Sequence, residues 1–513
     1  MYLTQCLHRG RQQQRDRVAV VSGGRRRSWA ELADRAARAG TVLRGLGVQP
    51  GDRVAILAPN TDDWLDLAFG TWWIGGVVNP VNTRWSPAEI AFSLEDCETA
   101  VMVAHPSLLA LAEAARTPGL RHLLRTGEAE GDAVPALEPL LRAAAPAEDL
   151  RQGGDALASL FYTGGTTGRP KGVMLSHRNM WSALVGRLAD IPTGRERVQL
   201  HTAPLFHVAG FGGMLVQLHA GSTGVFLQNF DAVALMETIE REGVTDVMLV
   251  PTMLSALLEH PEFRPERLRT LRRLTYGAAP IPAALLDRAM ALLPAIGFVQ
   301  AYGMTENWAV AAFNPAENHL PENRHRLRVT GRAYCNTELR IADAEGNTVP
   351  HGTVGEVLVR GPHVMLGYWN RPEETRAALR DGWLHTGDAA RMDADGYITV
   401  VDRLKDMIIT GGENVYSAEV ENAIGSHPGV RACAVIGVPH PHWGEAVHAV
   451  VVPHEGAALD EAAIRAHCRA LIAGYKVPKS VEFRDALPLS KVGKVMKNEL
   501  RAASLPRRTE TTA

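Results

Sequence analysis

A segment rich in glycine and threonine, FYTGGTTGRPKGVMLSHRN at residues 161–179, contains the first side chains suited to chemistry. The phosphate loop of kinases and GTPases has the pattern G-x-x-x-x-G-K-[ST]. Alignment on Lys171 places Pro170 and Gly172 at two of its four defining positions, and Pro170 has no N–H to donate. The segment therefore differs from that loop.

The same segment still has the properties of a phosphate cradle. Its glycines permit close backbone approach, and its hydroxyl groups and its single lysine are potential phosphate ligands. A polar surface turn is the alternative, because loops commonly use these residue types. The candidate ligands are Thr163, Gly164, Gly165, Thr166, Thr167, Gly168 and Lys171.

Lysine is rare in this chain, which has 54 Lys and Arg residues but only seven lysines. Lys171 is the only one in the first 404 residues. Codon bias is one explanation of the excess of arginine; the alternative is that a lysine retained in such a chain indicates, weakly, a place where a compact ammonium group is needed.

The elements expected to position these residues alternate between strands and helices, which predicts a largely parallel α/β sheet. Apolar spacing of three and four predicts an amphipathic helix at 29–48. A more β-rich segment follows the alternating region. The predicted strands are 52–60, 225–228, 244–251, 271–280, 355–361 and 396–403, with a further helix at 231–243.

The composition and the predicted order of helices and strands change after about residue 404, where six of the seven lysines lie. Helices are predicted at 417–427 and 459–471, and strands at 430–439 and 445–453. We therefore predict two domains, a large one at 1–404 and a small α+β domain at 405–513.

The overall composition and net charge limit the classes of function that this chain can have. A chain of 513 residues with 46% hydrophobic and 21% charged residues is typical of a globular protein of more than one domain. A net charge of −2 gives no reason to expect a nucleic-acid partner. The longest apolar stretch, 67–78, is too short to span a bilayer, and the N-terminus has no apolar signal core. Five scattered cysteines without a C-x-x-C pair fit a reducing cytoplasm.

Seven motifs in order connect the glycine-rich loop with the rest of the chain. They are FYTGGTTGRPKGV, PLFH (204–207), YGAAP (276–280), AYGMTE (301–306), WLHTGD (383–388), DRLKDMIITGGENVY (402–416) and VGKVMKNELR (492–501). Together they resemble the adenylate-forming superfamily, and within it the bacterial fatty-acyl and aromatic-acyl CoA ligases. The resemblance extends from about residue 10 to 500.

The resemblance implies a large domain of parallel α/β subdomains with a β-rich subdomain, followed by a small mobile C-terminal domain. It also implies an ATP- and Mg²⁺-dependent acid–CoA ligase. A hydrophobic monocarboxylate, fatty or aromatic, would attack the α-phosphate of ATP and release pyrophosphate. The thiol of CoA would then attack the acyl-adenylate and release AMP. The expected partners are small molecules, and the sequence does not decide whether the chain forms a homodimer.

The family likeness assigns roles in the ATP site. The loop would hold the β- and γ-phosphates, although its usual serine is replaced by Gly164. Tyr302 would contact adenine, Thr305 the α-phosphate and Glu306 the Mg²⁺ ion. Asp388 would accept both ribose hydroxyls, because an ionised carboxylate is acceptor-only. The further nucleotide-binding residues are Gly277, Ala278, Gly303 and Arg403.

Lys494 resembles the lysine that the family needs for adenylation, where it would bridge the carboxylate and the α-phosphate. The local run, PLSKVGK, departs from the family pattern, and Lys491 lies three residues earlier. The Gly-Lys pair identifies Lys494. An exposed tail lysine is the alternative.

The resemblance also implies a hinge and a CoA-binding face. Lys405 falls at the hinge position, about which the small domain would swing. One pose would present Lys494 to the adenylate. The other would present the CoA-binding residues near a pantetheine tunnel. These residues are Gly411, Gly412, Glu413 and Trp443, the last of which has simple core packing as its alternative.

The acyl pocket is expected beside His207, which would orient the carboxylate or close the thiol tunnel. A structural histidine is the alternative. A pocket-facing Trp308 would shorten the pocket and favour short, medium or aromatic acids. The expected lining residues are His207, Phe211, Gly212, Gly277, Ala278, Ala301 and Trp308.

Three rival functions stay open. A stand-alone adenylation enzyme would load an acyl carrier protein instead of CoA. A luciferase-like oxygenase has no feature in its favour over a ligase. A non-catalytic nucleotide-binding protein of the same fold is opposed by the presence of Glu306, Asp388 and Lys494.

Overall fold

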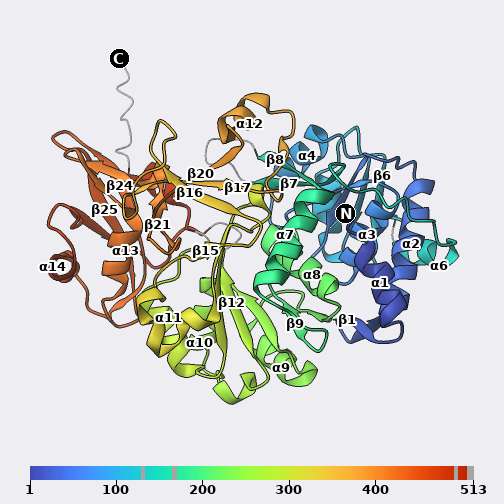
Figure 1. Cartoon of the computed structure of the whole chain (residues 1–513), viewed down its shortest axis with the longest axis horizontal. Helices are drawn as coiled ribbons and strands as arrows, with labels where there is room; N and C mark the ends of the chain where they lie inside the picture. The colour runs from blue at the N-terminus through green and yellow to red at the C-terminus, as the bar shows by residue number, and fades with distance from the viewer. Residues whose placement is uncertain (129–132, 164–169, 490–494, 505–513) are drawn as a thin grey trace.

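The computed structural model describes residues 1–128, 133–163, 170–489 and 495–504 (Figure 1). Figure 1 shows the N-terminal helices α1 and α2 at one end of the molecule, and α13, α14, β24 and β25 at the other. Sheets with helices on their faces occupy the part between these ends.

The first sheet is parallel in its centre and antiparallel at its edges. Strands β9, β11, β12 and β13 run side by side, so their carboxyl ends meet at one edge. In spatial order the strands are β15 (Arg332–Ala333), β14 (Ala312–Asn314), β13 (Gly297–Tyr302), β12 (Arg273–Gly277), β11 (Asp246–Leu249), β9 (Val198–His201), β10 (Thr223–Phe226), β1 (Val18–Ser22) and β2 (Arg25–Ser28).

The second sheet contains the hairpin that holds the glycine-rich loop. Strands β7 and β8 pair in antiparallel fashion. The pairs β7–β4, β4–β3, β3–β5 and β5–β6 are parallel. The order is β18 (Gly367–Tyr368), β8 (Lys171–Ser176), β7 (Leu157–Thr163), β4 (Val77–Pro80), β3 (Arg53–Leu57), β5 (Val101–Ala104) and β6 (His122–Arg125).

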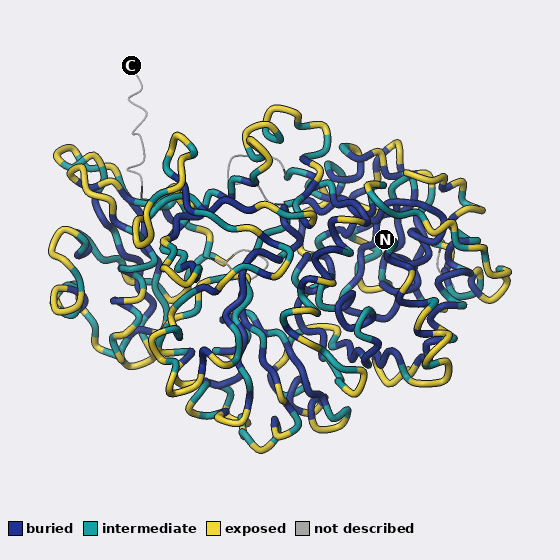
Figure 2. Tube along the Cα trace, in the orientation of Figure 1, coloured by how far each residue is buried: buried dark blue, intermediate teal, exposed yellow. Residues whose placement is uncertain are grey.

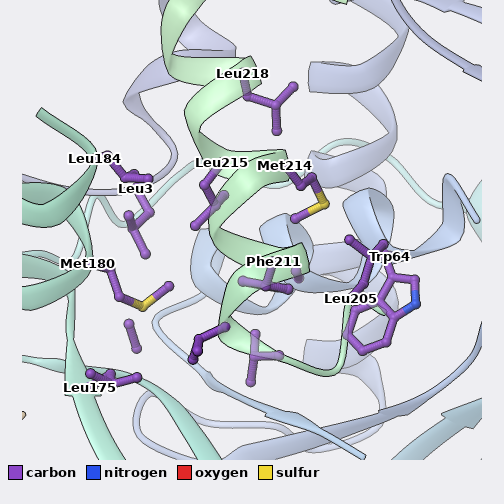
Figure 3. Close-up of a cluster of buried hydrophobic side chains, with 14 of the residues drawn as sticks. Leu3, Trp64, Leu175, Met180, Leu184, Leu205, Phe211, Met214, Leu215 and Leu218 are labelled. Carbon is purple, nitrogen blue, oxygen red and sulfur yellow. The ribbon is translucent and has the colours of Figure 1, made fainter. Parts of the chain in front are cut away.

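The main hydrophobic cluster lies between these two sheets, since it combines residues of both with residues of the helices that separate them. Figure 2 shows the continuous buried interior there. The separating helices are α2 (Trp29–Gly45), α3 (Asp63–Trp73), α7 (His177–Asp190) and α8 (Val208–Ala220). In Figure 3, Phe211, Met214, Leu215 and Leu218 project from α8 among Trp64, Met180 and Leu184.

Two further clusters cover the outer faces of the sheets. Helices α9 (Ala232–Glu242), α10 (Pro251–Glu259) and α11 (Ala283–Leu292) pack on the first sheet. Helices α4 (Pro87–Asp96) and α5 (Leu109–Ala114) pack on the second. The remaining helices of the large part are α1 (Gln5–Gln13), α6 (Leu137–Ala143) and α12 (Pro372–Ala378).

Local chemistry explains where the predicted helix at 29–48 begins. The Ser28 side chain accepts from the Glu31 N–H, and the Glu31 carboxylate accepts from the Ser28 N–H, which forms a capping box. The helix ends at Gly45, three residues earlier than predicted. The apolar stretch 67–78 is buried in α3 and β4, as expected of core. Within the described ranges, no helix is long and apolar enough to cross a membrane.

An antiparallel sheet follows in the β-rich segment, which confirms the strands predicted at 355–361 and 396–403. Its strands are β16 (Glu338–Ala342), β17 (Gly355–Arg360), β19 (Leu379–Arg380), β20 (Trp383–Met392) and β21 (Ile398–Arg403).

The C-terminal part has its own sheet and hydrophobic clusters. The predicted helices and strands there are confirmed, with ends shifted by a few residues at most. The fold is therefore mixed α/β with a large N-terminal and a small C-terminal part, while the boundary at 404/405 stays a prediction. The elements are β22 (Ile408–Thr410), β23 (Glu413–Val415), α13 (Ser417–Gly425), β24 (Val430–His440), β25 (Gly444–Pro453), α14 (Glu461–Leu471), β26 (Ser480–Phe483) and α15 (Lys497–Ser504).

The buried His201 side chain predicts a loss of stability in acid. Burial lowers the pKa of His201 from 6.5 to about 3, so the unfolded chain binds a proton that the folded chain does not bind between these values. The contribution of His201 is fully present above pH 6.5 and falls as pH falls, by ~2 kcal/mol at pH 5.

Replacement by glutamine tests this contribution. Chemical unfolding of wild type and His201→Gln at pH 7.5 and pH 5 should give a stability difference that shifts by ~2 kcal/mol in favour of the variant at the lower pH. Other titrating groups are common to both proteins and cancel. A difference independent of pH would contradict the prediction.

Candidate active site

A cavity of about 3260 Å³ lies where the carboxyl ends of β12 and β13 face the C-terminal part. Its walls come from the first two sheets, from α7 and α8, and from the segment around Lys405. Loops at the carboxyl ends of parallel strands are the usual location of ligand sites in α/β proteins. Most of the residues predicted to bind substrate line this cavity.

Three predicted nucleotide ligands form a connected group at one side of the cavity. The Tyr302 hydroxyl donates to Asp388 Oδ2 at 2.6 Å, and Arg403 Nε lies 2.7 Å from Asp388 Oδ1. Asp388 and Arg403 are paired residues on β20 and β21, so sheet register places them together. Burial, with the Asp388 charge second, raises the pKa of Tyr302, which keeps its hydroxyl a proton donor.

Glu306 lines the same cavity and is 7% exposed. Its Oε1 accepts a hydrogen bond of 2.8 Å from the Tyr368 hydroxyl, and burial raises the pKa of its carboxyl group. The Lys171 ammonium lies 5.2 Å from the centre of the Tyr368 ring. The Tyr368 side chain therefore contacts both the Glu306 carboxylate and the Lys171 ammonium.

Thr163 and Lys171 face each other at the open end of the β7–β8 hairpin, and both line the cavity. Thr305, the first residue of a short 3₁₀ helix, lines it as well. The predicted loop residues Gly164, Gly165, Thr166, Thr167 and Gly168 lie outside the described residues.

Close backbone packing explains the glycine at 277. A Cβ atom there would lie 2.2 Å from the carbonyl oxygen of Ala301 on the neighbouring strand, so only glycine permits this approach. A Cβ at Gly303 would lie 2.3 Å from the carbonyl carbon of Ala309. Ala278 lines the cavity with a φ of 63°, a left-handed conformation that non-glycine residues seldom adopt.

The predicted acyl-pocket residues divide into two groups. His207, Gly212, Ala278, Ala301 and Trp308 line the cavity, and Gly277 does not. The structure instead places Phe211 in the core, where it is 0% exposed and packs against Trp72. Phe211 also packs against Trp64, as Figure 3 shows. Helix α8 is apolar on all sides, so the sequence pattern did not show which face meets the core.

Trp308 forms an aromatic wall of the cavity. It is 2% exposed and packs edge-on against Phe161, with ring centres 5.4 Å apart. Its φ of 54° places it in the left-handed region, which is an outlier for a bulky residue. Strain of this kind is retained where packing determines the position, and it is common at ligand sites.

The C-terminal part closes one side of the cavity. The predicted hinge residue Lys405 lines it, and burial lowers the pKa of this lysine. Leu489 and Val495 also line it and form an isolated β-bridge. Lys494, the predicted adenylation lysine, falls between them and lies outside the described residues.

The predicted CoA-binding residues are not brought to this cavity. Gly411, Gly412 and Glu413 lie at the exposed turn between β22 and β23. The Gly411 N–H donates to the Trp443 carbonyl oxygen at 2.9 Å, so the turn and the tryptophan lie together. The Trp443 ring stacks on His440 and lies under the Lys479 ammonium.

Sequence reasoning missed Tyr368, which joins Lys171 and Glu306. Tyr368 pairs with Val173 because the two-residue strand β18 adds to the edge of β8. A strand of two residues has no periodic pattern, so its partner is set by the tertiary fold.

Sequence reasoning also missed a polar network between β21 and the C-terminal helices. Asp402 Oδ2 accepts from the N–H and the hydroxyl of Ser417 at 2.5 and 2.7 Å. The Lys497 ammonium donates to the Ser417 hydroxyl and lies 2.7 Å from Glu421. These residues tie the C-terminal part to the large part in the present arrangement.

Comparison with known proteins agrees with this geometry. A family model described as AMP-binding enzyme matches residues 7–369, and one described as AMP-binding enzyme C-terminal domain matches 419–494. A feruloyl-CoA synthase from an Amycolatopsis species is 44% identical over 489 residues, covering 94% of this chain and 95% of that protein.

Two further similarities cover nearly the whole chain. The fatty acid–acyl-carrier-protein ligase ScoC of Streptomyces coeruleorubidus is 34% identical, with 94% of this chain and 92% of that protein covered. A crystal structure of the anthranilate CoA ligase AuaEII in complex with anthranoyl-AMP has a TM-score of 0.91 at 28% identity, covering 98% and 97% of the two chains.

Proposed function

The chain belongs to the family of AMP-binding enzymes, and we propose that it joins an aromatic acid to CoA. It is an ATP-dependent acid–CoA ligase that works through an acyl-adenylate. The observation that supports the aromatic acid most strongly is the 44% identity to a feruloyl-CoA synthase over 94% of the chain.

The cavity supports the same choice of acid. Trp308 presents a flat aromatic wall, while Gly212 and Ala301 leave space on the other sides. A Cβ atom added at Gly212 would lie 3.6 Å from Trp308 Nε1, so the two residues face each other. Offset or edge-on aromatic contacts stabilise a planar ring in such a space. The carboxyl group of the acid would lie toward His207.

Leaving-group chemistry explains why ATP is needed. A carboxylate cannot release oxide, whereas an acyl phosphate releases AMP when the CoA thiol attacks its carbonyl carbon. In our proposal Asp388 accepts the ribose hydroxyls, and Tyr302 and Arg403 hold that carboxylate in place. Thr163 and Lys171 bind the departing pyrophosphate, and Thr305 binds the α-phosphate.

The donor set at Glu306 fits Mg²⁺, which usually takes one or two carboxylates and obtains its other ligands from phosphate oxygens and water. Within the described chain, no group of three or more His, Cys, Asp and Glu residues forms a complete cage. Glu306 alone would therefore hold the ion beside the phosphates. Bound Mg²⁺ would neutralise charge on the phosphoryl oxygens.

Two poses of the C-terminal part would serve the two half-reactions. In the present arrangement Leu489 and Val495 line the cavity, and we assign this pose to the adenylation half-reaction. The turn at 411–413 and Trp443 would approach only after rotation about Lys405. The hydrogen bonds between Asp402 and Ser417 would have to be exchanged in that rotation, because Asp402 precedes the hinge and Ser417 follows it.

A panel of acids tests the proposal. Purified protein with ATP and Mg²⁺ should form AMP in a CoA-dependent manner with cinnamic acids. Benzoate, acetate and palmitate should react at least about 10-fold more slowly, because a difference of 1.4 kcal/mol in transition-state binding suffices for that factor. Efficient use of palmitate would overturn the aromatic assignment and the role of Trp308 in limiting chain length.

The same assay tests the acyl acceptor. The similarity to ScoC makes a carrier protein the second candidate. Pyrophosphate exchange that proceeds without CoA-dependent AMP formation would favour it. Nucleotide binding without either reaction would favour a non-catalytic member of the fold.

A further inference from the structure

The far end of the acyl side of the cavity is charged. Gln199, Asp246 and Arg273 pair in register across β9, β11 and β12, so their side chains leave the sheet on the same face. Gln199 Nε2 donates to the carbonyl oxygen of Gly213 at 3.2 Å, which shows that this face is turned toward α8. All three side chains line the cavity.

This charged end is remote from the residues that would hold the carboxyl group. Gly277, which pairs with Ala301, comes four residues after Arg273 on β12. At the usual rise of a strand that separation is ~13 Å. The acid would therefore lie along the strands, with its carboxyl group near Ala301 and its other end toward Arg273.

Two guanidinium groups, those of Arg187 and Arg273, and one carboxylate, that of Asp246, line the cavity at this end. The Asp246 carboxylate is shared between Arg197 at 3.2 Å and Arg273 at 2.5 Å. It also accepts from the Thr245 hydroxyl at 2.6 Å. Arg187 adds a third guanidinium from α7. Burial first, and the charge of Arg187 second, lower the pKa of Arg273 to about 10, so the two cations are neighbours.

The Arg187 guanidinium has N–H groups that donate to no acceptor within the described residues. Its Nη1 donates to the carbonyl oxygen of Ile191 at 2.9 Å, and no salt bridge of Arg187 exists within the described residues. The nearby Asp190 accepts from the Cys335 N–H instead. Arg187 is half-buried and lines the cavity together with Ala183 and Leu184, which share its face of the helix.

An apolar substrate end would displace the water molecules around this cation and would accept none of its hydrogen bonds, which costs free energy. An oxygen atom would accept from the guanidinium instead. We propose that Arg187, supported by the Arg273–Asp246 pair, binds an oxygen substituent on the aromatic ring of the acid, at the position remote from the carboxyl group. This inference rests on the proposed aromatic substrate and adds the chemical group that selects it.

The test compares two acids of nearly equal size, 4-hydroxycinnamate and 4-methylcinnamate, with unsubstituted cinnamate as reference. A hydrogen bond to a charged group contributes ~1.5–3 kcal/mol, so kcat/KM of wild type should favour the hydroxyl compound by about 10- to 100-fold. Arg187→Met should abolish that preference by lowering kcat/KM for the hydroxyl compound, whereas kcat/KM for 4-methylcinnamate should not fall, because the cost of desolvating the cation is removed. Arg187→Lys, which keeps a cationic donor of different shape, should retain part of it.

Arg178→Met is the matched control, because Arg178 lies on the same helix but is exposed and pairs with Asp155 at 3.0 Å. It should keep the full preference. Equal losses with both substituted acids in Arg187→Met would show a structural role and overturn the inference. So would a wild type indifferent between the hydroxyl and methyl groups. Turnover of none of the cinnamates would instead overturn the aromatic proposal on which the inference rests.

Discussion

Replacing Lys494 with alanine should slow formation of the acyl-adenylate by on the order of 10²- to 10³-fold, which is the usual cost of removing one group that stabilises transition-state charge. Negative charge concentrates where the carboxylate attacks the α-phosphate, and a lysine that bridges both groups offsets it. The measurement is single-turnover formation of acyl-adenylate, or pyrophosphate exchange into ATP.

The second half-reaction should be spared by this replacement. When preformed acyl-adenylate and CoA are supplied, Lys494→Ala should form thioester within about threefold of wild type, since the proposed lysine acts only before pyrophosphate leaves. Lys491→Ala, three residues earlier, is the matched control and should leave both half-reactions unchanged. Equal losses in the two half-reactions would contradict the proposed role of Lys494.

Replacing Asp388 with asparagine should raise the KM for ATP by about 100-fold, because two hydrogen bonds to a charged acceptor are worth at least ~3 kcal/mol. The amide would also weaken the contacts from Tyr302 and Arg403, which lie 2.6 and 2.7 Å from the carboxylate. Steady-state kinetics with varied ATP at saturating acid measures the effect.

Two controls separate nucleotide binding from general damage. The KM for the acid should change less than about threefold in Asp388→Asn, because the carboxylate lies on the nucleotide side. Asp395→Asn, at an exposed turn beyond the same β-sheet, should leave the KM for ATP unchanged. If Asp388→Asn raised the KM values for both substrates equally, the ribose-binding role would be wrong.

The sequence by itself determined the fold class and the order of the elements. Hydrophobic periodicity and turn residues are local properties, so they located α2, β11, β12, α13 and α14 to within a few residues. The motif residues Tyr302, Glu306 and Asp388 were also identifiable, because their roles depend on short contiguous patterns that a resemblance preserves.

Only the tertiary structure decided which side chains share a space. Phe211 and Gly212 are neighbours in a helix that is apolar on all sides, yet one lies in the core and the other lines the cavity. Tyr368 reaches Glu306 because a two-residue strand adds to β8. Sequence periodicity does not specify these pairings between distant segments, because they depend on sheet register and helix packing.

The charged end of the acyl cavity is the clearest case. Arg187, Asp246 and Arg273 are separated by up to 86 positions, and each alone resembles an ordinary surface charge. The register of β11 and β12 and the face that α7 presents bring them together. In our proposal substrate selection is thus decided by the tertiary structure, since a pocket is enclosed by side chains from several elements, whereas the candidate nucleotide-binding residues Tyr302 and Asp388 were each recognisable from a short motif.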